Sequence, residues 1–77
     1  MYKDLIEYLA KSLVDNPDEV EVREREEEKS VQLELCVNQQ DLGKVIGRQG
    51  KTARAMRTIL GAAAAKEGRR ASLEIVE

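Results

Sequence analysis

Basic residues gather around a short glycine-bounded segment, residues 47–50, whose sequence is GRQG. Lys44 precedes it, Lys51 and Arg54 follow it, and no acidic residue occurs between Lys44 and Arg57. Glycine adopts backbone angles that are closed to other residues, so it lets a ligand approach the main chain closely. Free amides at the start of a following helix would favour negative charge. The segment therefore predicts a binding site for a phosphate group.

Two glycines three positions apart are weak evidence alone, because chance gives such a pair in about one chain in three of this length. The alternative is an ordinary helix-turn-helix corner with a solvated basic face. The string VIGRQGK, residues 45–51, favours the phosphate interpretation. It joins two helical patterns, holds a basic residue between the glycines and opens a basic helix.

Hydrophobic periodicity predicts the helices that would position this segment. One amphipathic helix is expected over about residues 2–14, and Pro17 disfavours its continuation. A short helix over about residues 41–46, with Asp41 as its candidate cap, leads into the glycines, and a longer one follows over about 51–66. The longer helix is predicted to expose Lys51, Arg54, Arg57 and Thr58 and to pack Thr52, Ala53, Met56, Ile59, Leu60 and Ala63 on the core.

Alternation of apolar and polar residues predicts three strands. The first strand begins near Val20, the second covers residues 31–37 and the third covers residues 71–75. A short acidic link over about residues 26–30 suits a hairpin tip between the first two. The order is helix, strand, strand, helix, helix, strand. An α+β fold is expected, with a three-stranded mixed sheet and three helices on one face.

Composition limits the classes of function. Seventy-seven residues make one domain, over residues 1–77, and a chain this short is marginally stable, which makes a partner chain plausible. The net charge is −2, with 5 basic against 11 acidic residues in positions 1–40 and 8 against 4 in positions 41–77. The chain has no histidine, and Cys36 is its only cysteine. We therefore expect no enzyme, no cofactor and no metal site. With no signal peptide or membrane-spanning run, we expect a soluble cytoplasmic protein without membrane contact.

The run GKVIGRQGKTARAMRTILGAAAAKEGRR, residues 43–70, resembles the small bacterial KH-domain RNA-binding proteins of the KhpA family, also called YlqC, which have the type II KH arrangement. KH domains clamp about four nucleotides of single-stranded RNA beside a Gly-x-x-Gly loop. Carried over by position, the RNA-binding residues would be Lys44, Val45, Ile46, Gly47, Arg48, Gln49, Gly50, Lys51 and Arg54. In this interpretation Val45 and Ile46 help to line an aliphatic groove for the bases.

The resemblance also implies partners and a role. It suggests a homodimer, or a complex with a larger KH-containing protein of the KhpB type (also called Jag or EloR). The role would be that of an RNA chaperone or post-transcriptional regulator linked to cell shape. Two alternatives stay open: a protein-interaction subunit with vestigial RNA binding, and a single-stranded DNA binder. Glu26, Glu27 and Glu28 are expected to border the RNA-binding surface and to weaken phosphate binding.

Overall fold

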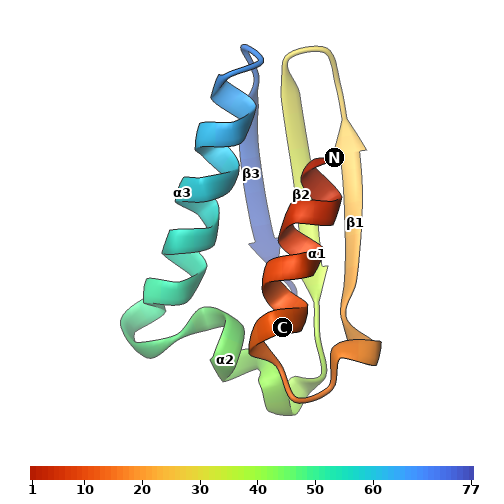
Figure 1. Ribbon diagram of the computed structural model, residues 1–77, viewed down its shortest axis with the longest axis vertical. Coiled ribbons are helices and arrows are strands. Elements are labelled where there is room, and N and C mark those ends of the chain that lie inside the picture. The colour runs from red at the N-terminus through yellow and green to blue at the C-terminus, as the bar shows by residue number, and fades with distance from the viewer.

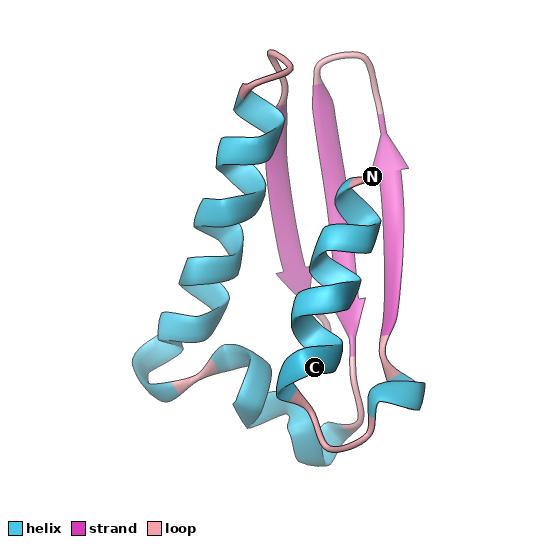
Figure 2. Ribbon diagram, in the orientation of Figure 1, coloured by secondary structure: helices cyan, strands magenta, loops and turns pink.

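Three helices lie on one face of a three-stranded sheet, and the other face of the sheet is uncovered (Figure 1 and Figure 2). The computed structural model describes all of residues 1–77. The elements follow the predicted order: α1 Tyr2–Leu13, β1 Glu21–Glu26, β2 Ser30–Cys36, α2 Leu42–Ile46, α3 Lys51–Ala65 and β3 Arg70–Ile75. The predicted fold class is confirmed.

The sheet has the strand order β1-β2-β3 and is mixed. β1 and β2 form an antiparallel hairpin, whereas β2 and β3 run parallel. Parallel neighbours need a long crossover connection, and the run from α2 through α3 supplies it. The residues 47–50, which we call the glycine loop, therefore lie inside this crossover, between α2 and α3.

The core lies between the sheet and the helices. In β2, Val31, Leu33 and Leu35 are buried, while the residues between them face away from the helices. This alternation is what one covered face of a strand requires. The buried cluster consists of Tyr2, Ile6, Ala10, Val20, Val22, Val31, Leu33, Leu35, Val45, Met56, Leu60, Ala64 and Leu73.

α3 packs on a narrower line than we predicted. Its buried residues are Ala53, Met56, Leu60 and Ala64. Ile59, which we expected in the core, is 45% exposed. Each residue turns the helix by about 100°, so Ile59 lies well off this line, on the flank of α3 that faces α1. The expectation for Ile59 was wrong because α1 leaves this part of the flank open to solvent.

The carboxylate of Asp41 does not cap α2, contrary to expectation. It accepts hydrogen bonds from the backbone N–H of Asp15 at 3.2 Å and of Asn16 at 3.0 Å, and from the Asn16 side chain at 3.0 Å. Asp41 is 1% exposed and lies at the start of α2. It therefore ties the segment after α1 to the helix that leads into the glycine loop.

Candidate nucleic-acid interface

The glycine loop is a tight turn in which every residue except Arg48 has a positive φ. Gly47 has φ 78° and ψ 170°, Gln49 has φ 58° and Gly50 has φ 74°. The N–H of Gly50 donates to the carbonyl of Gly47 over 3.1 Å and closes the turn. Only glycine readily adopts the angles of Gly47, so the first glycine is required by the backbone path.

Close packing imposes the same requirement on Gly47. A Cβ atom there would lie 2.2 Å from Oγ1 of Thr52 and 2.8 Å from the backbone nitrogen of Thr52. A Cβ atom at Gly50 would meet nothing within 4 Å. The loop backbone at Gly47 thus lies directly against the first turn of α3, and Gly50 is needed only for its backbone conformation.

The start of α3 has no side-chain cap, although the N–H of Lys51 already donates to the carbonyl of Arg48. Gly50 occupies the capping position. The first backbone N–H groups of a helix have no partner within it, and they carry the positive end of the helix dipole. Arg54 donates through Nη2 to the carbonyl of Gln49 over 3.3 Å, which engages a loop oxygen. The corner therefore presents donors and positive charge to an anion.

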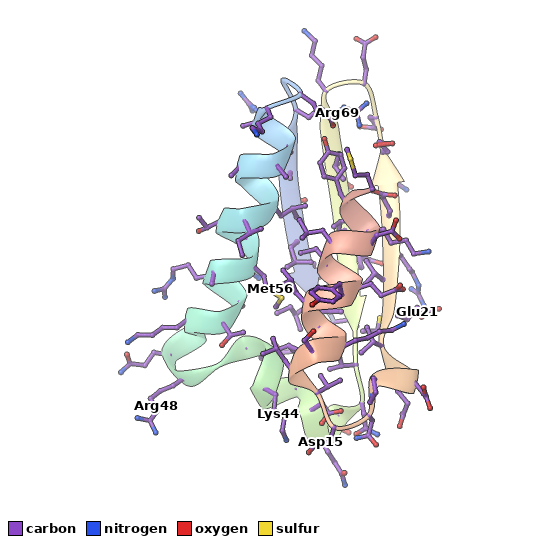
Figure 3. All side chains as sticks on the ribbon, viewed as in Figure 1. Asp15, Glu21, Lys44, Arg48, Met56 and Arg69 are labelled. Atoms are coloured by element: carbon purple, nitrogen blue, oxygen red, sulfur yellow. The ribbon has the colours of Figure 1, made fainter.

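Most of the cations around this corner are not neutralised by a carboxylate. Arg48, Lys51, Arg54 and Arg57 are exposed, and none has an acidic group within the 4.0 Å of an ion pair. In Figure 3 the Arg48 side chain extends away from the body of the molecule. Their combined field at the loop is positive even though the whole chain carries −2.

Lys44 is different from these four residues. Its ammonium lies 3.1 Å from the carboxylate of Asp15 and 3.9 Å from that of Asp41. Figure 3 shows Lys44 and Asp15 at the same end of the molecule. Two carboxylates therefore offset much of the charge that Lys44 would offer to a phosphate.

The two apolar residues before the glycine loop differ in how far they are buried. Val45 is 0% exposed and fixes α2 to the core, so its side chain offers no surface to a ligand. Ile46 is half-buried and keeps an apolar surface beside the loop. The two hollows of the molecule lie elsewhere, one on the open face of the sheet and one between α1 and the end of α3. Neither hollow borders the glycine loop, where the candidate interface is an exposed surface.

The contact between Arg57 and β3 is a feature of this surface that sequence reasoning did not identify. The Nε of Arg57 donates to the backbone carbonyl of Leu73 in β3 over 3.0 Å. The sequence places Arg57 on the basic side of α3, but the partner depends on how α3 lies against the sheet. No local signal could have revealed it.

The acidic hairpin tip does not border the glycine loop. Residues 27–29 connect β1 and β2 at the end of the molecule where α3 finishes, whereas the loop lies where α3 begins (Figure 1). α3 has 15 residues, which corresponds to a separation of about 22 Å along its axis. Glu26 pairs with Arg69 at 2.6 Å, at that same far end. The expectation that Glu26–Glu28 border the RNA-binding surface therefore does not hold at the glycine loop, where a phosphate would lie far from their carboxylates.

No group of acidic or cysteine side chains converges in a way that would hold a metal ion. None of the helices has the length and apolar character that crossing a bilayer requires.

Comparison with known families gives a match over almost the whole chain. A family model described as "KhpA/KhpB, KH domain" matches residues 3–75. A protein of Borreliella burgdorferi named RNA-binding protein KhpA is 58% identical over 74 residues, which are 96% of this chain and 90% of that protein. The protein of the same name from Aquifex aeolicus is 57% identical over 75 residues, or 97% of this chain and 95% of the relative.

Solved structures share the fold at low sequence identity. A crystal structure of Era in complex with MgGDPNP and nucleotides 1506-1542 of 16S ribosomal RNA matches with a TM-score of 0.71 and 16% identity, over 96% of this chain and 28% of that one. A structure of Aquifex aeolicus Era bound to GDP.AlF4- gives a TM-score of 0.69 at 16% identity, over 96% of this chain and 29% of Era. These likenesses concern the fold alone.

Proposed function

Because the chain belongs to the KhpA/KhpB family of KH-domain proteins, we propose that residues 1–77 act as one KH domain that binds single-stranded RNA at the glycine loop. The observation that carries the proposal is the group of four cations without acidic partners around the glycine-bounded corner at the uncapped start of α3. Curated relatives are named RNA-binding proteins, which agrees with a binding role and with no catalytic step.

The binding mode follows from the chemistry at the corner. A phosphate meets the uncapped start of α3, where the helix dipole is positive, and Arg48 and Lys51 supply full charges on either side of Gly50. Arg54 stands one helical turn beyond Lys51 and already bonds the loop carbonyl of Gln49. Charge-assisted hydrogen bonds to phosphate are stronger than neutral ones, so these groups hold the sugar-phosphate backbone.

Three further residues of the predicted site have smaller or indirect roles. Ile46 offers a half-exposed apolar surface on which part of a base can rest. Lys44 contributes little because Asp15 already lies 3.1 Å from its ammonium. Val45 supports the loop from the core without contacting RNA.

A charge reversal in the loop tests this function. Arg48→Asp with Gln49→Asp places two carboxylates where we expect phosphate, and Asp tolerates the positive φ of 58° at Gln49 better than most residues. We expect RNA affinity, measured by fluorescence anisotropy with an eight-nucleotide strand, to fall at least tenfold while the circular dichroism spectrum stays unchanged. If the folded variant bound RNA as the parent does, the loop would not be the binding site.

A matched control lies on the uncovered face of the sheet. Arg25 of β1 and Gln32 of β2 are exposed and lie opposite each other in the sheet. Replacing both by Asp therefore makes the same change of charge on the face of the sheet that points away from the helices. This control variant should keep at least half of the parent affinity. A loss equal to that of the loop variant would indicate that net charge, and not the loop, governs binding.

We also propose that the chain associates with a second KH protein, either another copy or a larger KhpB-type chain, through a surface that we call the helix seam. The seam comprises Met1, Leu5 and Tyr8 of the α1 region and Ile59 and Ala63 of α3. Met1, Leu5 and Ala63 line a hollow of about 460 Å³, and Met1 and Tyr8 are 72% and 71% exposed. An exposed apolar surface of this kind suits a protein partner. It lies on the flank of α3 opposite Arg54 and Arg57.

With RNA on one flank of α3 and a protein partner on the other, the chain would act in the cytoplasm as a post-transcriptional regulator or RNA chaperone. The helix seam also favours the second candidate function, a protein-interaction subunit in which RNA binding is weak. The loop variant separates the two, because it should leave association through the seam unchanged. Cations read DNA phosphates equally well, so competition between RNA and DNA strands of one sequence decides which nucleic acid is preferred.

A further inference from the structure

β3 presents a free backbone edge to the solvent beside α3. It is the last strand in the order β1-β2-β3. The N–H of Arg70 donates to Lys29 and that of Val76 donates to Leu35, each over 2.9 Å. Peptide groups alternate in direction along a strand, so the even-numbered residues of β3 face β2. The N–H and C=O groups of Ala71, Leu73 and Ile75 therefore point outward.

Arg57 engages the middle acceptor of this edge. Its Nε–H donates to the carbonyl of Leu73 over 3.0 Å, and the contact is partly buried. An arginine side chain has only donors, and no carboxylate engages the remaining N–H groups of Arg57. Because the carbonyl of Leu73 already accepts a hydrogen bond from Arg57, Leu73 presents mainly its outward N–H to a ligand. The surface around Arg57 is thus a patch of hydrogen-bond donors, which we call the donor patch.

This donor patch continues the flank of α3 that starts at the glycine loop. Arg54 bonds the loop carbonyl of Gln49, and Arg57 bonds the strand carbonyl of Leu73. The two arginines are three residues apart, or about 4.5 Å along the helix. A nucleotide whose phosphate rests on the loop therefore brings its base within reach of Arg57, and the bond to Leu73 holds the guanidinium in a fixed orientation.

We propose that Arg57 is a specificity-determining residue that selects bases with two adjacent hydrogen-bond acceptors. This inference rests on the proposed RNA binding at the glycine loop. The terminal N–H groups of arginine form a planar fork that matches two neighbouring acceptors. Guanine offers O6 and N7, and cytosine offers O2 and N3. Adenine and uracil alternate donors with acceptors along their edges, so they satisfy one arm of the fork and oppose the other.

Single-stranded RNA octamers of uridine, in which the two central bases are C, G, A or U, test the selection. We expect the C and G strands to bind about tenfold more tightly than the A and U strands, within the range for one bidentate contact between arginine and a base. Arg57→Met keeps the length of the side chain but removes all donors, so it should bring the four affinities within twofold of each other. Arg57→Lys keeps the charge without the fork, and it should also lose the selection while recovering overall affinity.

Arg25→Met is the matched control, because Arg25 is exposed on the uncovered face of the sheet and has no acidic partner. It should keep the tenfold preference. The preference is a ratio of affinities measured on one variant. A general loss of stability in Arg57→Met would lower all four affinities alike and would leave that ratio unchanged.

Three results would overturn the inference. Equal binding of the four strands by the parent protein would remove the selection while leaving the proposed function intact. An unchanged preference in Arg57→Met would assign the selection to another residue. Absence of binding to all four strands would remove the inference together with the proposed function.

Discussion

At the scale of single residues, the two glycines of the loop perform different tasks. Position 47 requires glycine both because of its uncommon backbone conformation and because Thr52 leaves no room for a Cβ atom. Gly50 has an open environment and only a left-handed conformation, with φ 74°. The motif predicted that both positions need glycine. Only the structure shows that the contact with Thr52 makes this requirement stricter at position 47 than at position 50.

Gly47→Ala should therefore be much more harmful than Gly50→Ala. The new methyl group at Gly47 would clash with Thr52, and we expect the free energy of unfolding to fall by about 2–3 kcal/mol. At Gly50 the left-handed conformation alone should cost about 1 kcal/mol. Urea denaturation of the two variants measures both values. A larger loss in Gly50→Ala would contradict this ranking.

Asp41 predicts a dependence of stability on pH. Burial raises the pKa of its carboxyl group, but hydrogen bonds from Asn16 and Asp15 and the charge of Lys44 outweigh burial, so the pKa lies below its ordinary value. A carboxyl group with a lowered pKa in the folded state stabilises the fold above its unfolded pKa, about 3.9 for Asp. That contribution disappears as the pH falls through the lower folded value.

Asp41→Asn should thus be less stable than the parent at pH 7, since the amide leaves a hydrogen-bond donor facing donors. The difference in melting temperature between parent and variant should shrink as the pH falls from 5 toward 3, because only the parent titrates at this position. Asp18→Asn, at an exposed residue whose side chain forms no hydrogen bond or ion pair, is the control and should show no such trend. A difference independent of pH would mean that the charge of Asp41 does not stabilise the fold.

At the scale of elements, α3 presents three different surfaces on three sides. One side packs on the sheet through Met56 and Leu60, a second presents Arg54 and Arg57, and a third contributes Ile59 to the helix seam. Periodicity predicted the helix and its basic side because both follow from local spacing. It misplaced Ile59 because the extent to which a flank is covered depends on the distance between α1 and α3, which local spacing does not contain.

Ile59→Glu should separate folding from association. Ile59 is 45% exposed, so the charge can remain hydrated in the monomer, and we expect little change in the melting temperature. If a second copy covers the helix seam, the buried charge should weaken self-association at least tenfold in sedimentation equilibrium.

Thr58→Glu provides the control for that experiment, since it adds the same charge one residue away, on the basic side of α3. Its self-association should match that of the parent. Dimers of equal strength in all three proteins would exclude the helix seam as the interface, and a parent that stays monomeric would leave a different chain as the partner.

At the scale of the whole molecule, the hairpin tip and the glycine loop lie at opposite ends. The acidic tip, residues 27–29 with Glu26, lies beyond the C-terminal end of α3, and the unpaired cations surround its N-terminal end. The sequence showed an acidic first half and a basic second half. It could not show where the tip lies relative to the glycine loop, because that position depends on how the hairpin is placed against the crossover. This separation removes the repulsion that we expected between the tip and a bound phosphate.

The salt dependence of binding should therefore report only the cations at the loop. For single strands the slope of log K against log salt is about −0.7 per phosphate contact, so three or four contacts predict a slope of about −2 to −3. Lys51→Gln removes one exposed cation and should make the slope shallower by about 0.7. Lys29→Gln makes the same change at the acidic tip and should leave the slope as it is. Equal effects of the two lysines in a titration with potassium chloride would mean that RNA responds to the overall charge of the protein and not to the cations at the glycine loop.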